Sequence, residues 1–184
     1  MDYKSKIMDE QAVSRSMARI THEIIEKNKG VDDICLMGIK RRGLPLAQVL
    51  AENIKKFEGT EVDVGYIDIT FYRDDLSLTA EMPTTGDSFF PCDITDKKIV
   101  LVDDVIYTGR TVRAAIDAVF SSGRPKAIQL AVLVDRGHRE LPIRPDFVGK
   151  NIPTSKSELV CVMVDEYDGE TGVYLCDNPE RVII

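Results

Sequence analysis

The pattern of apolar and polar positions along the chain predicts strands and helices in alternation. Runs of mostly apolar residues, typical of strands buried on both faces, occur at residues 34–39, 99–102 and 127–135. The segments after the first two runs repeat apolar residues three and four apart, the pattern of a helix packed on a sheet. Because short turns join each strand to its helix, the sequence predicts an α/β fold with a central parallel sheet flanked by helices.

The first helix is predicted to begin near Asp9, a good N-cap residue, and to run to Lys29, with Gly30 as its stop. Its apolar stripe consists of Val13, Met17, Ile20 and Ile24. A separate polar stripe consists of Arg15, Arg19, His22 and Glu26. Periodicity alone predicts that this polar stripe is a solvated helix face.

Three consecutive bases, Lys40, Arg41 and Arg42, follow the strand at residues 34–39. Pro45 then marks the first turn of a helix that Gly59 ends. Bases at the carboxyl end of a central strand favour an anion site, although an exposed loop is the simpler alternative.

The stretch at residues 98–120 carries the strongest chemical signal. An apolar strand ends in Asp103 and Asp104, and a turn rich in hydroxyl groups and glycine, residues 107–111, leads into a helix. The free N–H groups and the dipole of a helix N-terminus favour a phosphate. The two carboxylates suit a ribose diol or a Mg²⁺ ion.

The remaining segments are less regular. Residues 61–70 are predicted to form a strand, and the long polar connection after it is either a disordered insertion or a functional lid. A hairpin arm at residues 77–92 is the alternative. Residues 136–156 are too rich in proline, glycine and charge to predict regular structure, and their five bases and two acids give a net charge of +3. Short strands at 159–164 and 172–176, with a possible third at 181–184, are expected at the edge of the sheet.

Composition bounds the class of protein. The 184 residues predict one domain, residues 1–184, with room for a core. The net charge of −7 argues against nucleic-acid binding over the whole surface, but not against a local basic patch. The four cysteines lack metal-binding spacing and are interpreted as reduced packing residues of a cytoplasmic protein. The N-terminus has no signal region and no apolar run is long enough to span a membrane, so no membrane association is expected.

The motif from Val100 to Thr111 resembles the phosphoribosyl pyrophosphate (PRPP) signature of the type I phosphoribosyltransferases: a strand, two acids, two apolar residues, a variable residue, then Thr-Gly-Arg-Thr. The resemblance implies that family's fold, with a small hood and a flexible lid loop. It also implies that Asp103 and Asp104 contact the ribose hydroxyls, directly or through Mg²⁺, and that Gly43 lets pyrophosphate approach the loop. The implied PRPP-binding residues are Lys40, Arg41, Arg42, Asp103, Asp104, Val105, Ile106, Tyr107, Thr108, Gly109, Arg110 and Thr111.

Longer motifs at residues 38–43, 68–77, 133–144 and 149–156 resemble one family within this class, the pyrimidine operon attenuation regulators, which are also uracil phosphoribosyltransferases. Tyr107 stands where purine enzymes of the class usually have a third acid. The family implies formation of UMP and pyrophosphate from uracil and PRPP with Mg²⁺. The implied catalytic residues are Asp103, Asp104 and Arg73, and the implied residues of the uracil wall are Arg136, Phe147, Val148 and Val160. The base that removes the uracil proton stays open.

The same family binds a stem-loop in the leader mRNA of the pyrimidine operon, and uridine nucleotides (UMP, UTP) promote this binding. The RNA-binding residues that the resemblance implies are Arg19, His22, His138, Arg139, Arg144 and Lys150. One departure is Ala18, where many members have threonine.

A surface large enough for an RNA hairpin suggests a homodimer or a higher homo-oligomer. The alternatives are a phosphoribosyltransferase for another base with no RNA-binding role, and an inactive nucleotide-sensing module.

Overall fold

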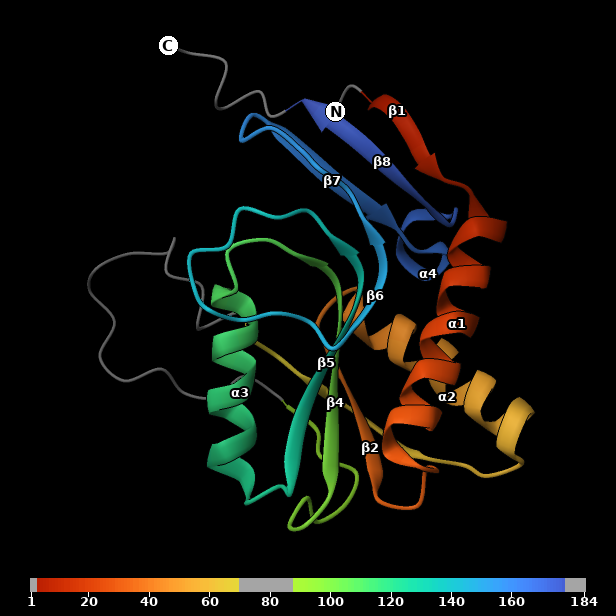
Figure 1. Ribbon diagram of the computed structural model, residues 1–184, viewed down its shortest axis with the longest axis vertical. Coiled ribbons are helices and arrows are strands. Elements are labelled where there is room, and N and C mark those ends of the chain that lie inside the picture. Colours follow the sequence, from red (N-terminus) through yellow and green to blue (C-terminus); the bar gives the residue numbers. More distant parts are fainter. Residues whose placement is uncertain (1–2, 70–87, 178–184) are drawn as a thin grey trace.

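The computed structural model describes residues 3–69 and 88–177. Its main sheet is parallel and has the strand order β3-β2-β4-β5-β6 (Figure 1). The strands are β2 (Ile34–Ile39), β3 (Asp63–Ile67), β4 (Lys98–Ile106), β5 (Ala127–Asp135) and β6 (Phe147–Asn151). The predicted central parallel sheet is therefore confirmed, and β4 lies at its middle.

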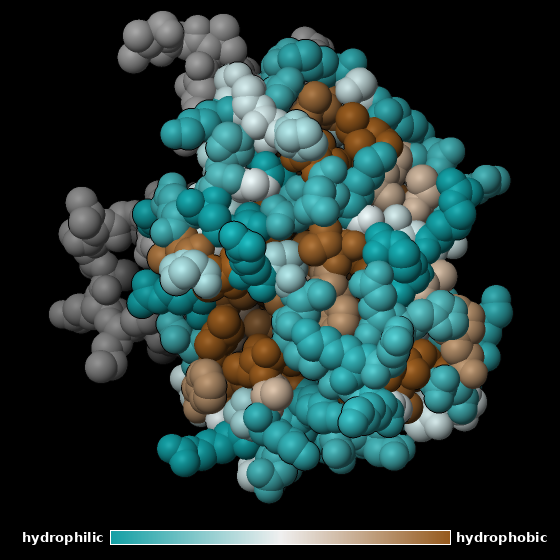
Figure 2. All heavy atoms as spheres, in the orientation of Figure 1, coloured by the Kyte–Doolittle hydropathy of each residue, from teal (hydrophilic) through white to brown (hydrophobic). Residues whose placement is uncertain are grey.

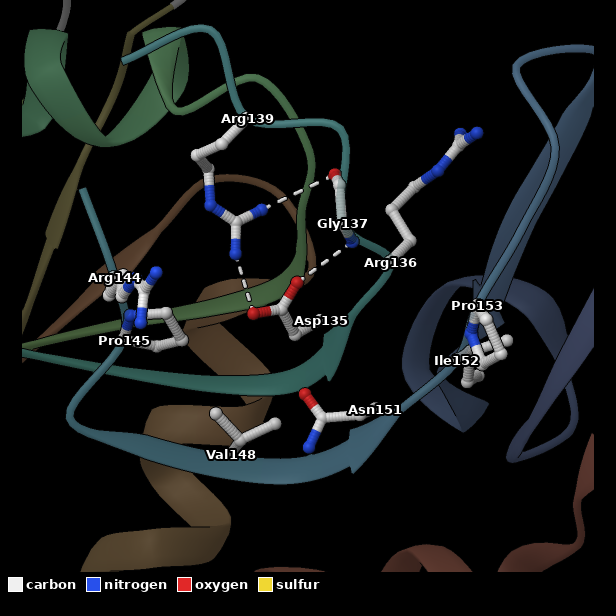
Figure 3. Close-up of a pocket in the computed structure, with 10 residues that line it drawn as sticks. All are labelled: Asp135, Arg136, Gly137, Arg139, Arg144, Pro145, Val148, Asn151, Ile152 and Pro153. Atoms are coloured by element: carbon white, nitrogen blue, oxygen red, sulfur yellow. Dashed lines mark hydrogen bonds and ion pairs between the residues drawn. The ribbon is translucent and has the colours of Figure 1, made fainter. Parts of the chain in front are cut away.

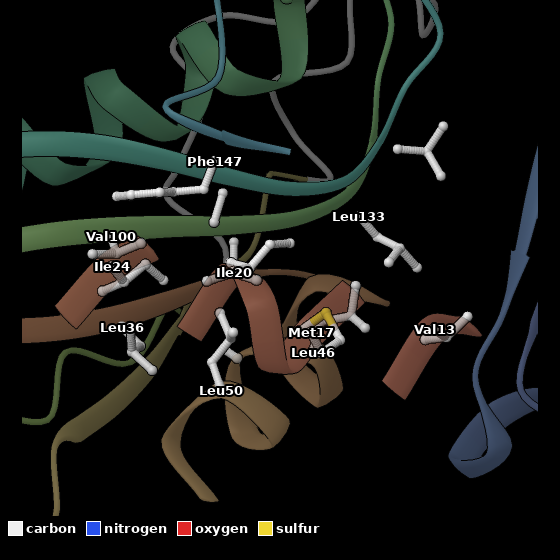
Figure 4. Packing of buried hydrophobic residues seen from close by; sticks show 14 of the residues in the cluster. Val13, Met17, Ile20, Ile24, Leu36, Leu46, Leu50, Val100, Leu133 and Phe147 are labelled. Carbon is white, nitrogen blue, oxygen red and sulfur yellow. The ribbon is translucent and has the colours of Figure 1, made fainter. Parts of the chain in front are cut away.

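Helices cover both faces of this sheet. Figure 1 shows α1 (Glu10–Asn28) and α2 (Gly43–Glu58) on one side and α3 (Arg110–Ser122) on the other. Alternate residues of β4 supply the two cores: Val100 packs with α1 and α2, whereas Leu101 packs with α3. Figure 4 shows the first core, where Ile20 and Ile24 of α1 meet residues of α2 and the sheet. Burying each such side chain contributes about 1.5–3 kcal/mol.

The predicted start of α1 is confirmed and its end is shifted. The Asp9 carboxylate accepts the N–H of Ala12 at 2.7 Å, as an N-cap does. The helix ends at Asn28, and Lys29 rather than Gly30 takes the left-handed capping conformation, with φ of 58°. Its N–H donates to the carbonyl of Glu26 at 3.1 Å.

A second, antiparallel sheet of three strands forms the predicted hood, in the order β1-β8-β7. It consists of β1 (Tyr3–Met8), β7 (Glu158–Met163) and β8 (Gly172–Asp177), with the short helix α4 (Asp165–Asp168) between the last two. The expectation that the final strands join the edge of the main sheet is wrong. They pair instead with the N-terminal strand, whose first four residues are exposed and give little apolar signal.

The expectation that residues 136–156 lack regular structure is wrong for Phe147–Asn151, which form β6. This edge strand pairs with β5 through its main chain, for example Ala131 with Phe147, so its few apolar residues are enough. The strand predicted at 61–70 is shorter, Asp63–Ile67. The proposed lid lies largely outside the described residues, as does the possible strand at 181–184. No helix in the described part of the chain is long and apolar enough to cross a membrane.

Candidate functional site

The carboxyl end of β4 and the start of α3 form a cradle around residues 103–111. Gly109 takes φ of +94° immediately before α3 begins at Arg110. The N–H of Arg110 donates to the Thr108 hydroxyl at 3.3 Å. This turn, residues 107–111, is called the phosphate loop below. A helix N-terminus together with hydroxyl groups is suited to binding a phosphate.

Asp103 and Asp104 form a carboxylate pair at the base of the cradle. Asp103 is only 7% exposed, and it accepts the N–H of Asp104 at 2.9 Å. Burial, followed by the negative charge of Asp104, raises the pKa of Asp103 well above its usual range. Burial also raises the pKa of Asp104, against the lowering effect of its hydrogen bonds and of Arg42. Within residues 3–69 and 88–177 neither carboxylate has an ion-pair partner, so the pair favours a bound cation or hydroxyl donors.

The three bases after β2 take different positions. Lys40 Nζ lies 4.0 Å from the centre of the Tyr66 ring and 3.6 Å from an Asp68 carboxylate oxygen. Arg41 is exposed. Arg42 forms a forked ion pair with Asp168 of the hood, with Nη2 2.9 Å from Oδ1 and Nε 3.3 Å from Oδ2. This loop therefore joins the main sheet to the hood.

Gly43 has a packing role that the sequence did not indicate. A Cβ atom there would lie 2.2 Å from the carbonyl oxygen of Val102. Gly38 is similar, because its Cβ would lie 2.4 Å from Leu44 Cα. Both glycines thus allow the base-rich loop and the start of α2 to lie directly on β2 and β4.

The four predicted residues of the uracil wall do not form one site: Arg136 and Val148 line a common cavity, and Phe147 and Val160 do not line it. Arg136 is buried and its guanidinium lies 4.2 Å from the centre of the Tyr107 ring. It also donates to the carbonyl of Glu158 at 2.6 Å. Phe147 is buried in the core on the α1 side, Val148 lies on β6, and Val160 lies on β7 of the hood. Only Arg136 is in contact with the phosphate loop.

The segment after β5 donates hydrogen bonds to carbonyl groups of the phosphate loop. No sequence pattern predicted this arrangement. We call residues 136–146 the strap. The N–H groups of Glu140 and Leu141 donate to the carbonyl of Thr108 at 2.9 and 3.1 Å. Arg139 Nη1 donates to the carbonyl of Tyr107 at 2.8 Å. The strap and the phosphate loop therefore form one connected unit.

Four of the six predicted RNA-binding residues gather around the edge strand β6. Arg19 of α1 donates to the β6 carbonyls of Val148 and Gly149, at 3.1 and 2.6 Å. Arg139 and Arg144 lie on the strap opposite β6 (Figure 3), and Lys150 lies on the strand itself. The basic surface, as used below, consists of Arg19, Arg139, Arg144 and Lys150.

The two predicted histidines lie elsewhere. The ring of His22 stacks on Phe57 of α2 at 4.3 Å between ring centres. His138 meets the edge of Tyr107 at 6.1 Å and contacts the carbonyl of Thr154 at 2.6 Å.

Figure 2 shows that hydrophilic residues cover most of the visible face, with hydrophobic residues in separate patches. Arg73 lies outside the described residues.

Comparisons with known proteins identify the class. A family model described as phosphoribosyl transferase domain matches residues 4–166, so the chain belongs to the phosphoribosyltransferases. The fold is similar to that of a hypoxanthine-guanine phosphoribosyltransferase from Bacillus anthracis, with a TM-score of 0.73 at 19% identity and coverage of 96% of this chain and 99% of that one. A hypoxanthine phosphoribosyltransferase from Staphylococcus aureus gives a TM-score of 0.72 at 18% identity, covering 97% and 95%.

Sequence relatives identify the family within this class. The chain is 63% identical over 179 residues to the bifunctional protein PyrR of Acetivibrio thermocellus, covering 97% of each chain. It is 60% identical over 178 residues to the bifunctional protein PyrR of Clostridium botulinum, covering 97% of this chain and 99% of that protein. The chain belongs to the bifunctional PyrR family. The predicted fold class and the predicted pair of functions, attenuation regulator and uracil phosphoribosyltransferase, are thereby confirmed.

Proposed function

We propose that the cradle at the end of β4 binds PRPP and transfers its phosphoribosyl group to uracil, forming UMP and pyrophosphate. The observation that carries this proposal is the carboxylate pair of buried Asp103 and half-buried Asp104 beside the phosphate loop. Residues 108–111 would hold the 5′-phosphate, and Asp103 and Asp104 would hold the ribose hydroxyls. Lys40, Arg41 and Arg42 would bind the pyrophosphate.

The carboxylate pair also fits Mg²⁺. Two adjacent carboxylates with raised pKa values supply oxygen ligands whose repulsion a divalent cation relieves. Mg²⁺ in proteins is commonly held by one or two carboxylates together with substrate oxygens and water, and the described residues offer no cluster of three or more such ligands. Bound there, the ion would neutralise charge on the PRPP oxygens.

The residues of the cradle are suited to the charge that develops during ribosyl transfer. As pyrophosphate leaves, positive charge grows at the anomeric carbon, and the ionised carboxylate pair would stabilise it. The bases after β2 would stabilise the negative charge of the departing pyrophosphate. Arg73, in the segment expected to close over the site, would add a further positive charge beside the pyrophosphate. That segment would also help to exclude water.

Substrate preference tests the enzyme proposal. Rates with uracil, orotate and hypoxanthine are compared at fixed PRPP and Mg²⁺. We expect turnover with uracil and little with the other bases. Turnover with hypoxanthine alone would contradict the proposal and favour a phosphoribosyltransferase for another base.

We further propose that the basic surface binds the leader mRNA stem-loop when UMP or UTP occupies the cradle. Guanidinium and ammonium groups at β6 suit phosphates and the bases of an unpaired loop. The strap supports the dependence on nucleotide, because it joins the Thr108 carbonyl to Arg139 and Arg144. We propose that both functions operate in the cytoplasm, in a homodimer or higher homo-oligomer whose size light scattering would measure.

Hairpin binding with and without UMP tests this regulatory proposal. Binding that is tighter with UMP supports it, and equal binding in both conditions contradicts it. The variants Arg144→Ala and His22→Ala should weaken RNA binding and spare catalysis. Loss of both activities in the same variant would contradict separate sites.

A further inference from the structure

A cavity of about 500 Å³ opens at the carboxyl ends of β5 and β6. The strap forms one side and β6 forms the other (Figure 3). No residue of the range 103–111 lines it, so it lies beside the carboxylate pair and the phosphate loop and does not include them. Arg136 and Val148, two of the four residues predicted for the uracil wall, do line it. Its volume lies within the range of about 300–1,000 Å³ that is usual for small-molecule sites.

One wall of the cavity is held rigidly. The Asp135 carboxylate binds Arg139 Nη2 at 2.5 Å and accepts the N–H of Gly137 at 2.9 Å. Arg139 Nε also donates to the carbonyl of Ile143 at 3.0 Å. Because these bonds fix the planar guanidinium before any ligand binds, the wall costs little to order.

Two polar side chains at the cavity, those of Arg144 and Asn151, are available to bind a ligand. Among residues 3–69 and 88–177, no hydrogen bond or ion pair involves the Arg144 guanidinium or the Asn151 side-chain amide. Both residues are exposed. An amide offers a donor and an acceptor side by side, which matches the edge of a nucleobase, and a guanidinium suits a phosphate.

Apart from Arg136, the rest of the lining is apolar. Val148 rises from β6 towards Asp135 in Figure 3, and Pro145 and Pro153 lie on either side. Arg19 binds the carbonyl of Val148, so the cavity lies within the basic surface rather than apart from it. An apolar surface, an amide and a guanidinium in one cavity match the base, the base edge and the phosphate of one nucleotide.

We propose that this cavity is a subsite for one unpaired nucleotide of the RNA hairpin. The base lies against Val148 with its edge on the Asn151 amide, and its phosphate lies on Arg144. Unpaired loop bases are the parts of RNA that proteins read in this way, whereas paired bases are inaccessible. The assignment rests on the proposed RNA-binding function and adds a specific contact to it.

The variant Asn151→Ala tests the subsite, with Gln48→Ala as the matched control, because Gln48 is an exposed amide on α2. With UMP present, we expect Asn151→Ala to weaken hairpin binding about tenfold. The slope of log affinity against log salt should stay unchanged, since no charge is removed. Gln48→Ala should bind as wild type, and uracil turnover should be unaffected in both variants.

A second measurement needs no variant. A hairpin with one 4-thiouridine in its loop is crosslinked to the wild-type protein, and the attached peptide is identified. We expect a crosslink within residues 144–153 from a single loop position. Crosslinks found only outside the strap and β6 would overturn the subsite.

The outcomes separate the subsite from the function on which it rests. A wild-type protein that does not bind the hairpin contradicts the regulatory proposal itself. Wild-type hairpin binding that Asn151→Ala leaves unchanged contradicts the subsite alone. If Asn151→Ala instead loses one bound UMP per chain and keeps its RNA affinity, the cavity holds a free nucleotide and the RNA assignment is wrong.

Discussion

Arg42 and Asp168 join the base-rich loop after β2 to the hood, with Arg42 Nη2 2.9 Å from Asp168 Oδ1. Asp168 Oδ2 also accepts the N–H of Val164 at 2.8 Å. Although burial alone would raise the pKa of Asp168, the Val164 N–H and Arg42 lower it below its usual range. The hood thus holds a side chain that we propose for the pyrophosphate.

Substituting Arg42 and substituting Asp168 should change the KM for PRPP by different amounts. We expect Arg42→Ala to raise the KM for PRPP about tenfold or more, because a charge-assisted contact to pyrophosphate is lost. Asp168→Ala should raise it less, because the arginine remains but is no longer oriented. Steady-state kinetics measure both, and Lys55→Ala, from an exposed pair with Glu61, is the control. A larger effect from Asp168→Ala would contradict a direct role of Arg42.

The carboxylate pair is expected to cost stability in the ligand-free protein. Asp103 is buried beside Asp104, so its charge is unfavourable without a cation. We expect Asp103→Asn to increase the free energy of unfolding at neutral pH by about 1–2 kcal/mol, while abolishing uracil turnover. The asparagine oxygen can still accept the N–H of Asp104. Urea unfolding measures the change, and a loss of stability would contradict it.

The same pair predicts how stability depends on pH. The pKa of Asp103 is raised in the folded state, so the folded protein binds more protons than the unfolded chain between the two pKa values. Protonated Asp103 therefore contributes its full stabilisation below the ordinary carboxyl pKa. This contribution is lost as the pH rises through the raised pKa of Asp103 in the folded protein. Urea unfolding of the ligand-free protein at a series of pH values should show this fall. Asp103→Asn should reduce it, and an unchanged slope would contradict the assignment.

Gly43 should tolerate no side chain. Because a Cβ would lie 2.2 Å from the carbonyl oxygen of Val102, Gly43→Ala must move the start of α2 away from β4. We expect a loss of about 1–3 kcal/mol in unfolding free energy and a weaker affinity for PRPP. Val49→Ala, at an exposed position of α2, is the control for helix stability. Normal stability with weak PRPP binding would indicate instead that the glycine acts only on the ligand.

Arg19 and Arg144 should differ although both are predicted to bind RNA. Arg19 donates to two carbonyls of the edge strand β6, whereas Arg144 has no such partner among the described residues. We therefore expect Arg19→Ala to lower the unfolding free energy by about 1 kcal/mol as well as RNA affinity. Arg144→Ala should lower RNA affinity alone and reduce the salt slope by about 1. Equal stability of the two variants would contradict the structural role of Arg19.

Local pattern determined much of this protein. The apolar runs predicted β2, β4 and β5, and Asp9 predicted the start of α1, because burial and capping act over a few residues. The acids and the turn after β4 predicted the cradle, because the carboxyl end of a central strand adjoins a helix N-terminus. The family motifs also indicated the bifunctional class.

Only the tertiary structure decided the long-range contacts. The pairing of β1 with β8, the hold of the strap on Thr108 and the contact of Arg19 with β6 join residues far apart in the chain. Main-chain hydrogen bonds make most of these contacts, and they leave no mark on the choice of side chains. The sequence also identified Arg42 as a base near pyrophosphate. Its ion pair with Asp168 could not be predicted, because the two residues lie far apart in the chain and only the position of the hood brings them together.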